Sequence, residues 1–120
     1  SQKSELSIVS DQFGTPTWTK DLASCILNLL VEKPSFGVYH LASLGYASWF
    51  DFATCFLNLA GNKCSVLPCS TETFVRPAKR PLNGRLNCSK YLDLGLRTPL
   101  GWKEGVLKFL EELAAHDSMD

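Results

Sequence analysis

The chain has no excess of either charge sign. Its 120 residues include twelve Lys and Arg and twelve Asp and Glu, so the formal net charge is zero. Proteins that bind nucleic acid or an anionic membrane usually carry a basic excess or a basic face. We therefore expect neither nucleic acid nor a membrane among the partners of this chain.

No long apolar run is present. The longest lies within residues 22–31 and is interrupted by Ser24 and Asn28, whereas a membrane-spanning helix needs roughly 20 apolar residues. The first five residues are polar and lack the basic and then apolar order of a secretory signal. We expect a cytoplasmic protein.

The cysteine pattern does not favour a metal site. There are five cysteines, and no two of them form a Cys-x-x-Cys pair. Tetrahedral zinc sites usually draw on such closely spaced ligands. We expect no bound metal, and we expect the cysteines to be reduced thiols with structural roles.

The eight glycines also lack a pattern. None forms Gly-x-Gly-x-x-Gly or Gly-x-x-Gly-x-x-Gly, the turns that place a dinucleotide pyrophosphate at the N-terminus of a helix. We therefore expect no dinucleotide cofactor to be bound by this chain alone.

What the chain does contain is a polar loop between an apolar strand and a helix. Within seven residues after Ser10, four polar side chains surround one Gly and one Pro: Asp11, Gln12, Thr15 and Thr17, with Gly14 and Pro16 setting the path. Loops that leave a scaffold strand often carry binding residues. The same composition also fits a purely structural strand-to-helix connection.

The apolar periodicity predicts an α/β chain with three main helices and a few short strands. We expect helices at residues 19–32, 49–60 and 101–115 and a brief one at 89–93, with strands at 6–10, 38–42, 64–67 and 85–87. Thr17 or Thr19 should cap the first helix, and Ser48 and Asp51 have the spacing of a capping box. All 120 residues are expected to form one domain.

A basic stretch lies in the irregular segment of residues 70–84 and just after it. It contains Arg76, Lys79, Arg80 and Arg85, and guanidinium groups suit diphosphate oxygens. Arg80 and then Arg76 are the strongest candidates for such a contact. The alternative is a solvated basic loop.

Several motifs in one order resemble the C-terminal portion of dTDP-4-dehydrorhamnose reductase, an extended short-chain dehydrogenase/reductase. The resemblance covers almost the whole chain. It rests on residues 6–17, Asp21-Leu22-Ala23, Gly37-Val38-Tyr39-His40-Leu41, Ser48-Trp49-Phe50-Asp51-Phe52-Ala53, residues 76–83, Arg85-Leu86-Asn87, Lys90 and Gly101-Trp102-Lys103-Glu104-Gly105.

The resemblance implies a fold and a function. The chain would be a fragment of an NAD(P)-binding Rossmann-like reductase, namely its substrate-binding subdomain, and its ligand a dTDP-linked 4-keto sugar that the family reduces with NADPH. The implied substrate-binding residues are Asp11, Gln12, Gly14, Thr15, Pro16, Thr17, Trp18, Arg76, Arg80 and Arg85. Trp18 could instead pack in a core, as could Trp49 and Trp102.

The family's catalytic pair is a Tyr followed four residues later by Lys. Tyr39, Tyr46 and Tyr91 are followed at that spacing by Ser43, Phe50 and Gly95. We expect no catalytic residue in this chain and no activity from it alone. The second hypothesis is a non-enzymatic interaction or regulatory module similar to reductase-like subunits, and a third is an oligomerising remnant.

The resemblance also places the strand of residues 38–42 in a parallel sheet that lies outside this chain. His40 within it should be a buried histidine. With that strand and the inner helix faces unpartnered, we expect either a homo-oligomer or docking of the missing N-terminal half. Magnesium between subunits, held by Glu5, Glu111 or Glu112, is a minor alternative implied by some family members.

Overall fold

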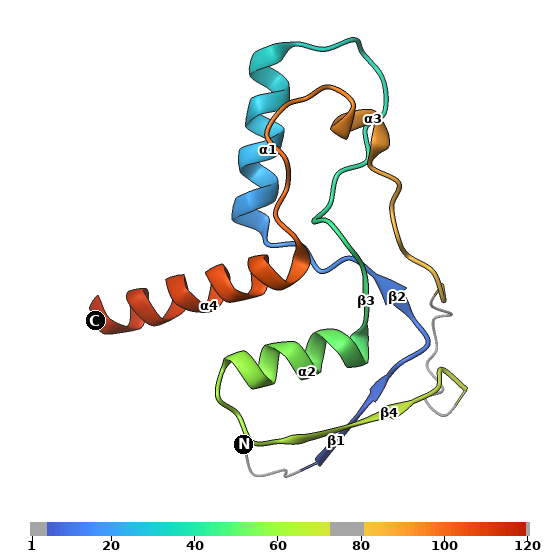
Figure 1. Ribbon diagram of the computed structural model, residues 1–120, viewed down its shortest axis with the longest axis vertical. Coiled ribbons are helices and arrows are strands. Elements are labelled where there is room, and N and C mark those ends of the chain that lie inside the picture. The colour runs from blue at the N-terminus through green and yellow to red at the C-terminus, as the bar shows by residue number, and fades with distance from the viewer. Residues whose placement is uncertain (1–4, 73–80, 120) are drawn as a thin grey trace.

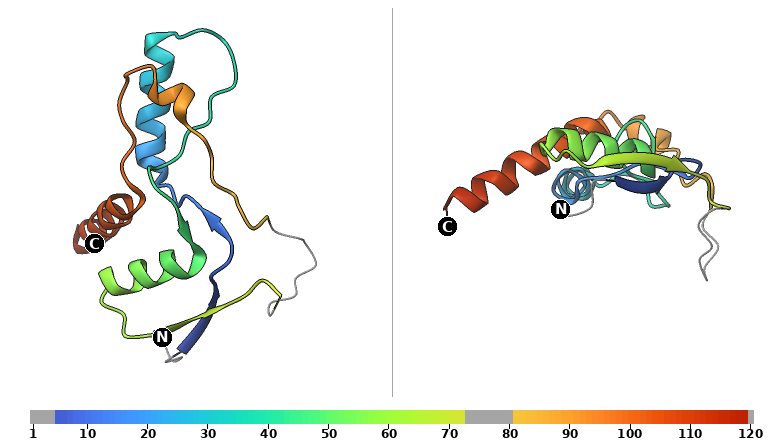
Figure 2. Two further views of the ribbon diagram at one scale, coloured as in Figure 1. Left: turned by 45° about the vertical axis from the view of Figure 1, so that its right-hand side comes forward. Right: turned by 90° about the horizontal axis from the view of Figure 1, so that it is seen from below.

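The structure, a computed structural model, describes residues 5–72 and 81–119 (Figure 1). The molecule is flat, with extents of 49 × 41 × 22 Å, and the view from below in Figure 2 shows its elements in one thin layer. Eight elements follow one another: β1 (Glu5–Val9), β2 (Phe13–Gly14), α1 (Thr19–Glu32), β3 (Ala47–Ser48), α2 (Trp49–Leu59), β4 (Ser65–Cys69), α3 (Ser89–Leu92) and α4 (Trp102–Met119).

Two small sheets flank the polar loop. β1 pairs in parallel with β4, from Glu5 opposite Ser65 to Val9 opposite Cys69. β2 pairs antiparallel with β3. We expected a strand at residues 64–67, ending before Pro68, but Pro68 lies within β4 opposite Ile8. A two-stranded sheet has only edge strands, and an edge strand tolerates a residue without an N–H group.

Two predicted strands are wrong. Residues 38–42 and 85–87 form no strand, since no strand among the described residues pairs with either segment. Val38 is 76% exposed, and His40, which we expected to be buried, is exposed as well.

The first helix begins and ends where the periodicity predicted, but it is capped differently. Its N-cap is Trp18, which makes no side-chain capping bond. The Thr17 hydroxyl instead donates to the Thr15 carbonyl and accepts a hydrogen bond from the Ser43 amide. Lys33 ends the helix in a left-handed conformation with φ of 48°.

The buried face of α1 carries one carboxylate and one thiol. Its buried residues are Asp21 and Cys25, which face the segment that leads into α4, shown beside α1 in Figure 1. Four large apolar side chains of α1 are exposed: Ile26 at 42%, Leu27 at 63%, Leu30 at 66% and Val31 at 65%. We call these four residues the α1 stripe.

The core lies where α2 meets α4. Ala47, Trp102 and Val106 are buried there, with Phe52, Cys55, Phe56 and Leu110 packed against them. The capping box of α2 is confirmed, since the Ser48 hydroxyl accepts from the Asp51 amide at 3.0 Å and the Asp51 carboxylate accepts from the Ser48 amide at 3.2 Å. Gly61, with φ of 75°, follows the C-cap Ala60.

The two last helices differ slightly from the expectation. α3 ends at Leu92, one residue before the predicted end, and its N-cap is Cys88; the Asn87 side chain accepts from the Ser89 amide at 3.0 Å. α4 continues to Met119, beyond the predicted end, and Phe109 on its apolar face is 40% exposed. Among residues 5–72 and 81–119, no helix has both the length and the apolar character needed to cross a bilayer. The five cysteines are free thiols.

Candidate functional site

The polar loop forms one wall of a pocket of about 300 Å³. The opposite wall is the start of α2, and Pro81 and Gly84 close one side. We call this cavity the loop pocket. Its lining is Gln12, Phe13, Gly14, Thr15, Pro16, Ala47, Ser48, Trp49, Phe52, Pro81 and Gly84. Four of the residues predicted to bind substrate are therefore brought together here.

Asp11 does not line this pocket, but its carboxylate fixes the loop through hydrogen bonds to Thr71. Its Oδ1 atom accepts from the Thr71 hydroxyl at 2.5 Å, and its two oxygens accept from the Thr71 amide at 3.0 and 3.1 Å. These hydrogen bonds, above all the one from the hydroxyl, keep the pKa of Asp11 below its ordinary value, because they favour the charged form. The Gln12 side-chain amide also donates to the Thr71 hydroxyl, at 3.2 Å.

The backbone of Phe13 fixes the next part of the loop. Its amide donates to the Leu82 carbonyl at 2.8 Å, and its carbonyl accepts from the Gly84 amide at 2.6 Å. A Cβ atom at Gly84 would lie 3.3 Å from the Phe13 carbonyl oxygen, so glycine permits this close approach. Two later parts of the chain therefore hold the loop in place, one at Thr71 and one at Leu82.

The loop threonines bind backbone groups of the segment before β3. The Thr15 hydroxyl donates to the Gly45 carbonyl at 3.0 Å, and Thr17 binds the Ser43 amide. Both side chains thus hold the loop against residues 43–45. Thr15 still lines the loop pocket, whereas Thr17 and Trp18 line a neighbouring aromatic cavity of about 340 Å³.

An aromatic and basic rim lies beside the loop pocket. The Arg85 guanidinium lies 4.6 Å from the centre of the Tyr46 ring, which meets Phe13 edge to face at 6.1 Å. Arg85 Nε donates to the Asn83 side-chain oxygen at 2.8 Å, so this exposed guanidinium has a fixed orientation. Arg76, Lys79 and Arg80 lie outside the described residues.

Sequence reasoning missed Thr71, Tyr46 and Trp49 as parts of this site. No local signal marks Thr71, which meets Asp11 across 60 residues of sequence. The capping box located the start of α2 but not its position against the loop. Of the acidic residues considered for magnesium, Glu112 forms an ion pair with Lys20 at 2.9 Å.

Comparison with known proteins identifies the family. The model of the family described as "RmlD substrate binding domain" matches residues 1–115. The chain belongs to this family. Among curated relatives, a dTDP-4-dehydrorhamnose reductase of Escherichia coli is 36% identical over 124 residues, covering 93% of this chain and 40% of the relative. The spore coat polysaccharide biosynthesis protein SpsK of Bacillus subtilis is 36% identical over 110 residues, covering 92% and 38%.

Solved structures show the same fold. A dTDP-4-dehydrorhamnose reductase from Clostridium acetobutylicum superposes with a TM-score of 0.86 at 40% identity, covering 93% of this chain and 40% of that one. A reductase from Bacillus anthracis, solved in complex with NADP, gives 0.82 at 35% identity, covering 92% and 38%. The predicted α/β fold and the resemblance to the substrate-binding, C-terminal part of these reductases are confirmed. The chain spans about two-fifths of the length of these relatives.

Proposed function

We propose that this chain is the sugar-nucleotide-binding portion of an NADPH-dependent dTDP-4-dehydrorhamnose reductase acting in dTDP-L-rhamnose biosynthesis. The observation that carries the proposal is the loop pocket. The loop that bears the family pattern, residues 11–17, supplies four of its lining residues, Gln12, Gly14, Thr15 and Pro16. The proposed ligand is the dTDP-linked 4-keto sugar.

The chemistry around the pocket suits an anionic sugar nucleotide. α2 begins at the pocket with Ser48 and Trp49 in the lining, and a helix N-terminus carries partial positive charge. Gln12 offers an amide for sugar hydroxyls, and Arg85 offers an oriented guanidinium beside the pocket. Arg80 and Arg76 remain the predicted diphosphate contacts, and Arg80 precedes the anchored Leu82 by only two positions in the sequence.

The residues of this chain do not fit the dinucleotide cofactor. The sequence has no glycine-rich turn, and the one parallel pair among the described strands, β1 with β4, is not followed by such a turn. In a complete reductase NADPH would supply the reducing chemistry, and the family's Tyr and Lys pair, which this sequence lacks, would lie outside this chain. The proposed role of this chain is to bind and orient the sugar nucleotide, and we expect it to be inactive alone.

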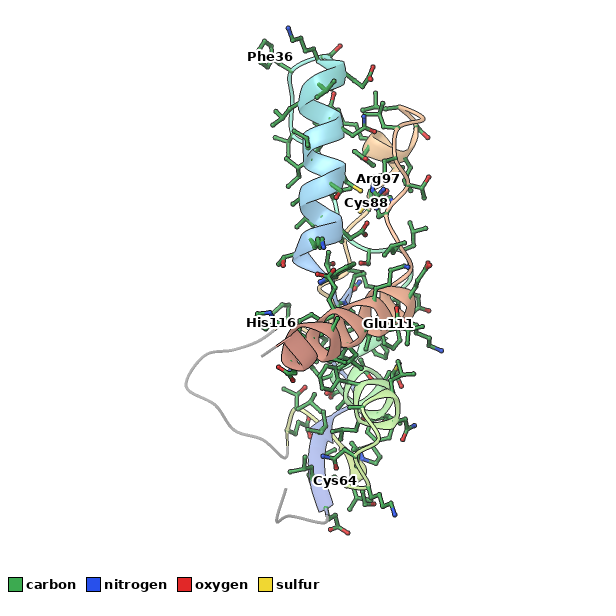
Figure 3. The ribbon with its side chains drawn as sticks, turned by 90° about the vertical axis from the view of Figure 1, so that its left-hand side faces the viewer. Phe36, Cys64, Cys88, Arg97, Glu111 and His116 are labelled. Carbon is green, nitrogen blue, oxygen red and sulfur yellow. The ribbon has the colours of Figure 1, made fainter. Side chains whose placement is uncertain are left out.

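The α1 stripe is the proposed contact surface for the remaining half of a reductase or for a second copy of the chain. Four large apolar side chains on one helix face are 42–66% exposed. Exposed apolar patches of this kind usually mark interaction sites. Figure 3 shows Phe36 at the far end of α1, pointing away from the molecule.

Isothermal titration calorimetry with dTDP and dTDP-L-rhamnose tests the binding role. We expect saturable heat at millimolar ligand or below. Replacing Arg85 with Ala should weaken binding by roughly fivefold, because about 1 kcal/mol of charge-assisted contact is lost. Lys63→Ala removes one exposed cation from the turn after α2 and serves as the matched control.

Two results would count against the proposal. Absence of saturable heat at millimolar dTDP-sugar would contradict the binding role and would favour the interaction-module hypothesis. Sustained NADPH oxidation by the pure 120-residue chain would contradict the expected inactivity.

A further inference from the structure

We propose that Thr71 is a positioning residue for the sugar-nucleotide loop, holding Gln12 in the wall of the loop pocket through its contacts with Asp11 and Gln12. The proposal rests on the function proposed above, because it assigns to Thr71 an effect on ligand affinity. It concerns a residue that lies outside the loop and outside the pocket lining.

Thr71 lies just beyond the point where the backbone pairing of β1 with β4 ends and side-chain contacts begin. The ladder ends with Val9 opposite Cys69, and the amide and hydroxyl of Ser10 both donate to the Cys69 carbonyl, at 2.8 and 3.2 Å. In the same register Asp11 then meets Thr71. Beyond Ser10, the contact between these two segments of the chain is made by the side chains of Asp11 and Gln12 with Thr71.

The hydroxyl of Thr71 suits this position because it bridges two different groups. It donates to Asp11 Oδ1 at 2.5 Å and lies 3.2 Å from Gln12 Nε2, which donates to it. A hydroxyl can do both at once, since it has one donor and two acceptor lone pairs. Valine has nearly the same shape and can do neither, whereas serine keeps both bonds.

The contacts determine which loop residue faces the ligand. Asp11 is directed to Thr71 and takes no part in the pocket, while Gln12 is held at the pocket wall by its amide nitrogen. This arrangement leaves the Gln12 carbonyl end as the part of the amide that can be offered to a sugar hydroxyl. Without the hydroxyl of Thr71, Gln12 would gain rotamers that ligand binding must then remove.

The test compares Thr71→Val and Thr71→Ser with the unmodified chain. We expect Thr71→Val to weaken dTDP-L-rhamnose binding by roughly five- to tenfold, from the loss of the bridging contacts, and Thr71→Ser to bind like the unmodified chain. Thr54→Val is the matched control, because in the described part of the chain the Thr54 hydroxyl bonds within α2, to the Phe50 carbonyl. Circular dichroism melts establish that the variants are folded.

A second readout needs no ligand. In the unmodified chain the Thr71 amide resonance should follow the titration of Asp11, whose pKa lies below its ordinary value because of the Thr71 bonds. Thr71→Val should raise the Asp11 pKa toward that value, and Thr71→Ser should not.

The outcomes separate this inference from the proposed function. If the unmodified chain binds the dTDP-sugar and Thr71→Val binds equally well, the inference is overturned and the proposed function stands. If the unmodified chain binds no dTDP-sugar, the proposed function and the ligand role of Thr71 both fail. An Asp11 titration that is unchanged in folded Thr71→Val would overturn the positioning contact itself.

Discussion

Asp21 is a buried carboxylate, 2% exposed, whose two oxygens each accept a hydrogen bond from the segment before α4. Oδ2 accepts from the Leu100 amide at 2.9 Å, and Oδ1 accepts from the Arg97 guanidinium at 3.3 Å. Asp21 lies in the first turn of α1. Its tertiary bonds attach α1 to the remainder of the chain, and Figure 3 shows Arg97 beside that helix.

Replacing Asp21 with Ala should destabilise the fold by about 2–3 kcal/mol, because the half-buried Leu100 amide would lose its acceptor and the Arg97 guanidinium its partner. Asp21→Asn should cost less, since its amide oxygen can still accept from Leu100. Urea unfolding measures both free energies. Asp117→Ala, an exposed position on α4, is the control, and an equal loss in the control and in Asp21→Ala would contradict the assigned role.

The ionisation of Tyr91 should make the fold less stable in alkaline solution. It is 1% exposed, and its hydroxyl donates to the Arg97 carbonyl at 2.6 Å. Burial, with a smaller contribution from Cys25, raises the pKa of Tyr91 from 10 to about 12. The unfolded chain therefore loses this proton first, so the contribution to stability is complete below pH 10 and is lost as the pH rises toward 12.

The measurement compares urea unfolding of the unmodified chain and Tyr91→Phe across that pH range. The variant should be less stable below pH 10, by about 1 kcal/mol for the lost hydrogen bond. The difference between the two proteins should shrink as the pH approaches 12. A constant difference would show that Tyr91 titrates normally in the fold.

At the scale of elements, the capping box makes the start of α2 the best-defined helix end. Ser48→Ala removes the hydroxyl that accepts from Asp51 and should destabilise the protein by about 1 kcal/mol. Asp51→Ala removes the reciprocal bond and should cost a similar or smaller amount. Chemical denaturation measures both, and an unchanged midpoint for Ser48→Ala would contradict the role of the cap.

Local patterns predicted the helices well, and the strands less well. The bounds of α1 and the cap of α2 depend on periodicity and on residues three positions apart, which the sequence shows directly. A strand depends on a partner from elsewhere in the chain. Residues 38–42 are apolar enough for a strand but have no neighbour among the described strands, and Pro68 is tolerated because β4 is an edge.

The site also combines residues that local patterns reveal with residues whose positions depend on distant parts of the chain. Gln12, Gly14, Thr15 and Pro16 could be placed in a binding loop because they follow a strand in a family-like order. The residues that support them could not be identified in this way. These are Thr71, Gly45 and Leu82, whose positions depend on the register of β1 with β4 and on the path of the chain. Two polar side chains that looked like ligand contacts are directed to these supports, since Asp11 binds Thr71 and Thr15 binds the Gly45 carbonyl. Thr17 is likewise directed to the protein, at the Ser43 amide.

At the scale of the whole molecule, the chain is more open than a compact domain. Its radius of gyration is 16.8 Å, against about 14 Å expected for a compact chain of this length. Its accessible surface is 8548 Å², against about 6,450 Å² expected for its mass. The excess of roughly 2,100 Å² is larger than the about 800 Å² that each partner contributes to a standard protein–protein interface, and the α1 stripe is part of this exposed surface.

Self-association through the α1 stripe is therefore expected for this chain in isolation. The variant Leu27→Glu with Leu30→Glu places two charges in the stripe while keeping good helix formers, so it should shift the chain toward the monomer. Each leucine contributes up to about 2 kcal/mol when an interface buries it. Sedimentation velocity over a range of concentrations measures the shift.

Leu107→Glu is the matched control, because Leu107 is a 44%-exposed leucine on α4, outside the stripe. The control should associate like the unmodified chain. If the unmodified chain is monomeric at every concentration, self-association is ruled out and the stripe remains as a surface for a different protein segment. In that case, adding the N-terminal part of a related reductase should produce a complex that the double variant does not form, since burial of the stripe would then require that partner.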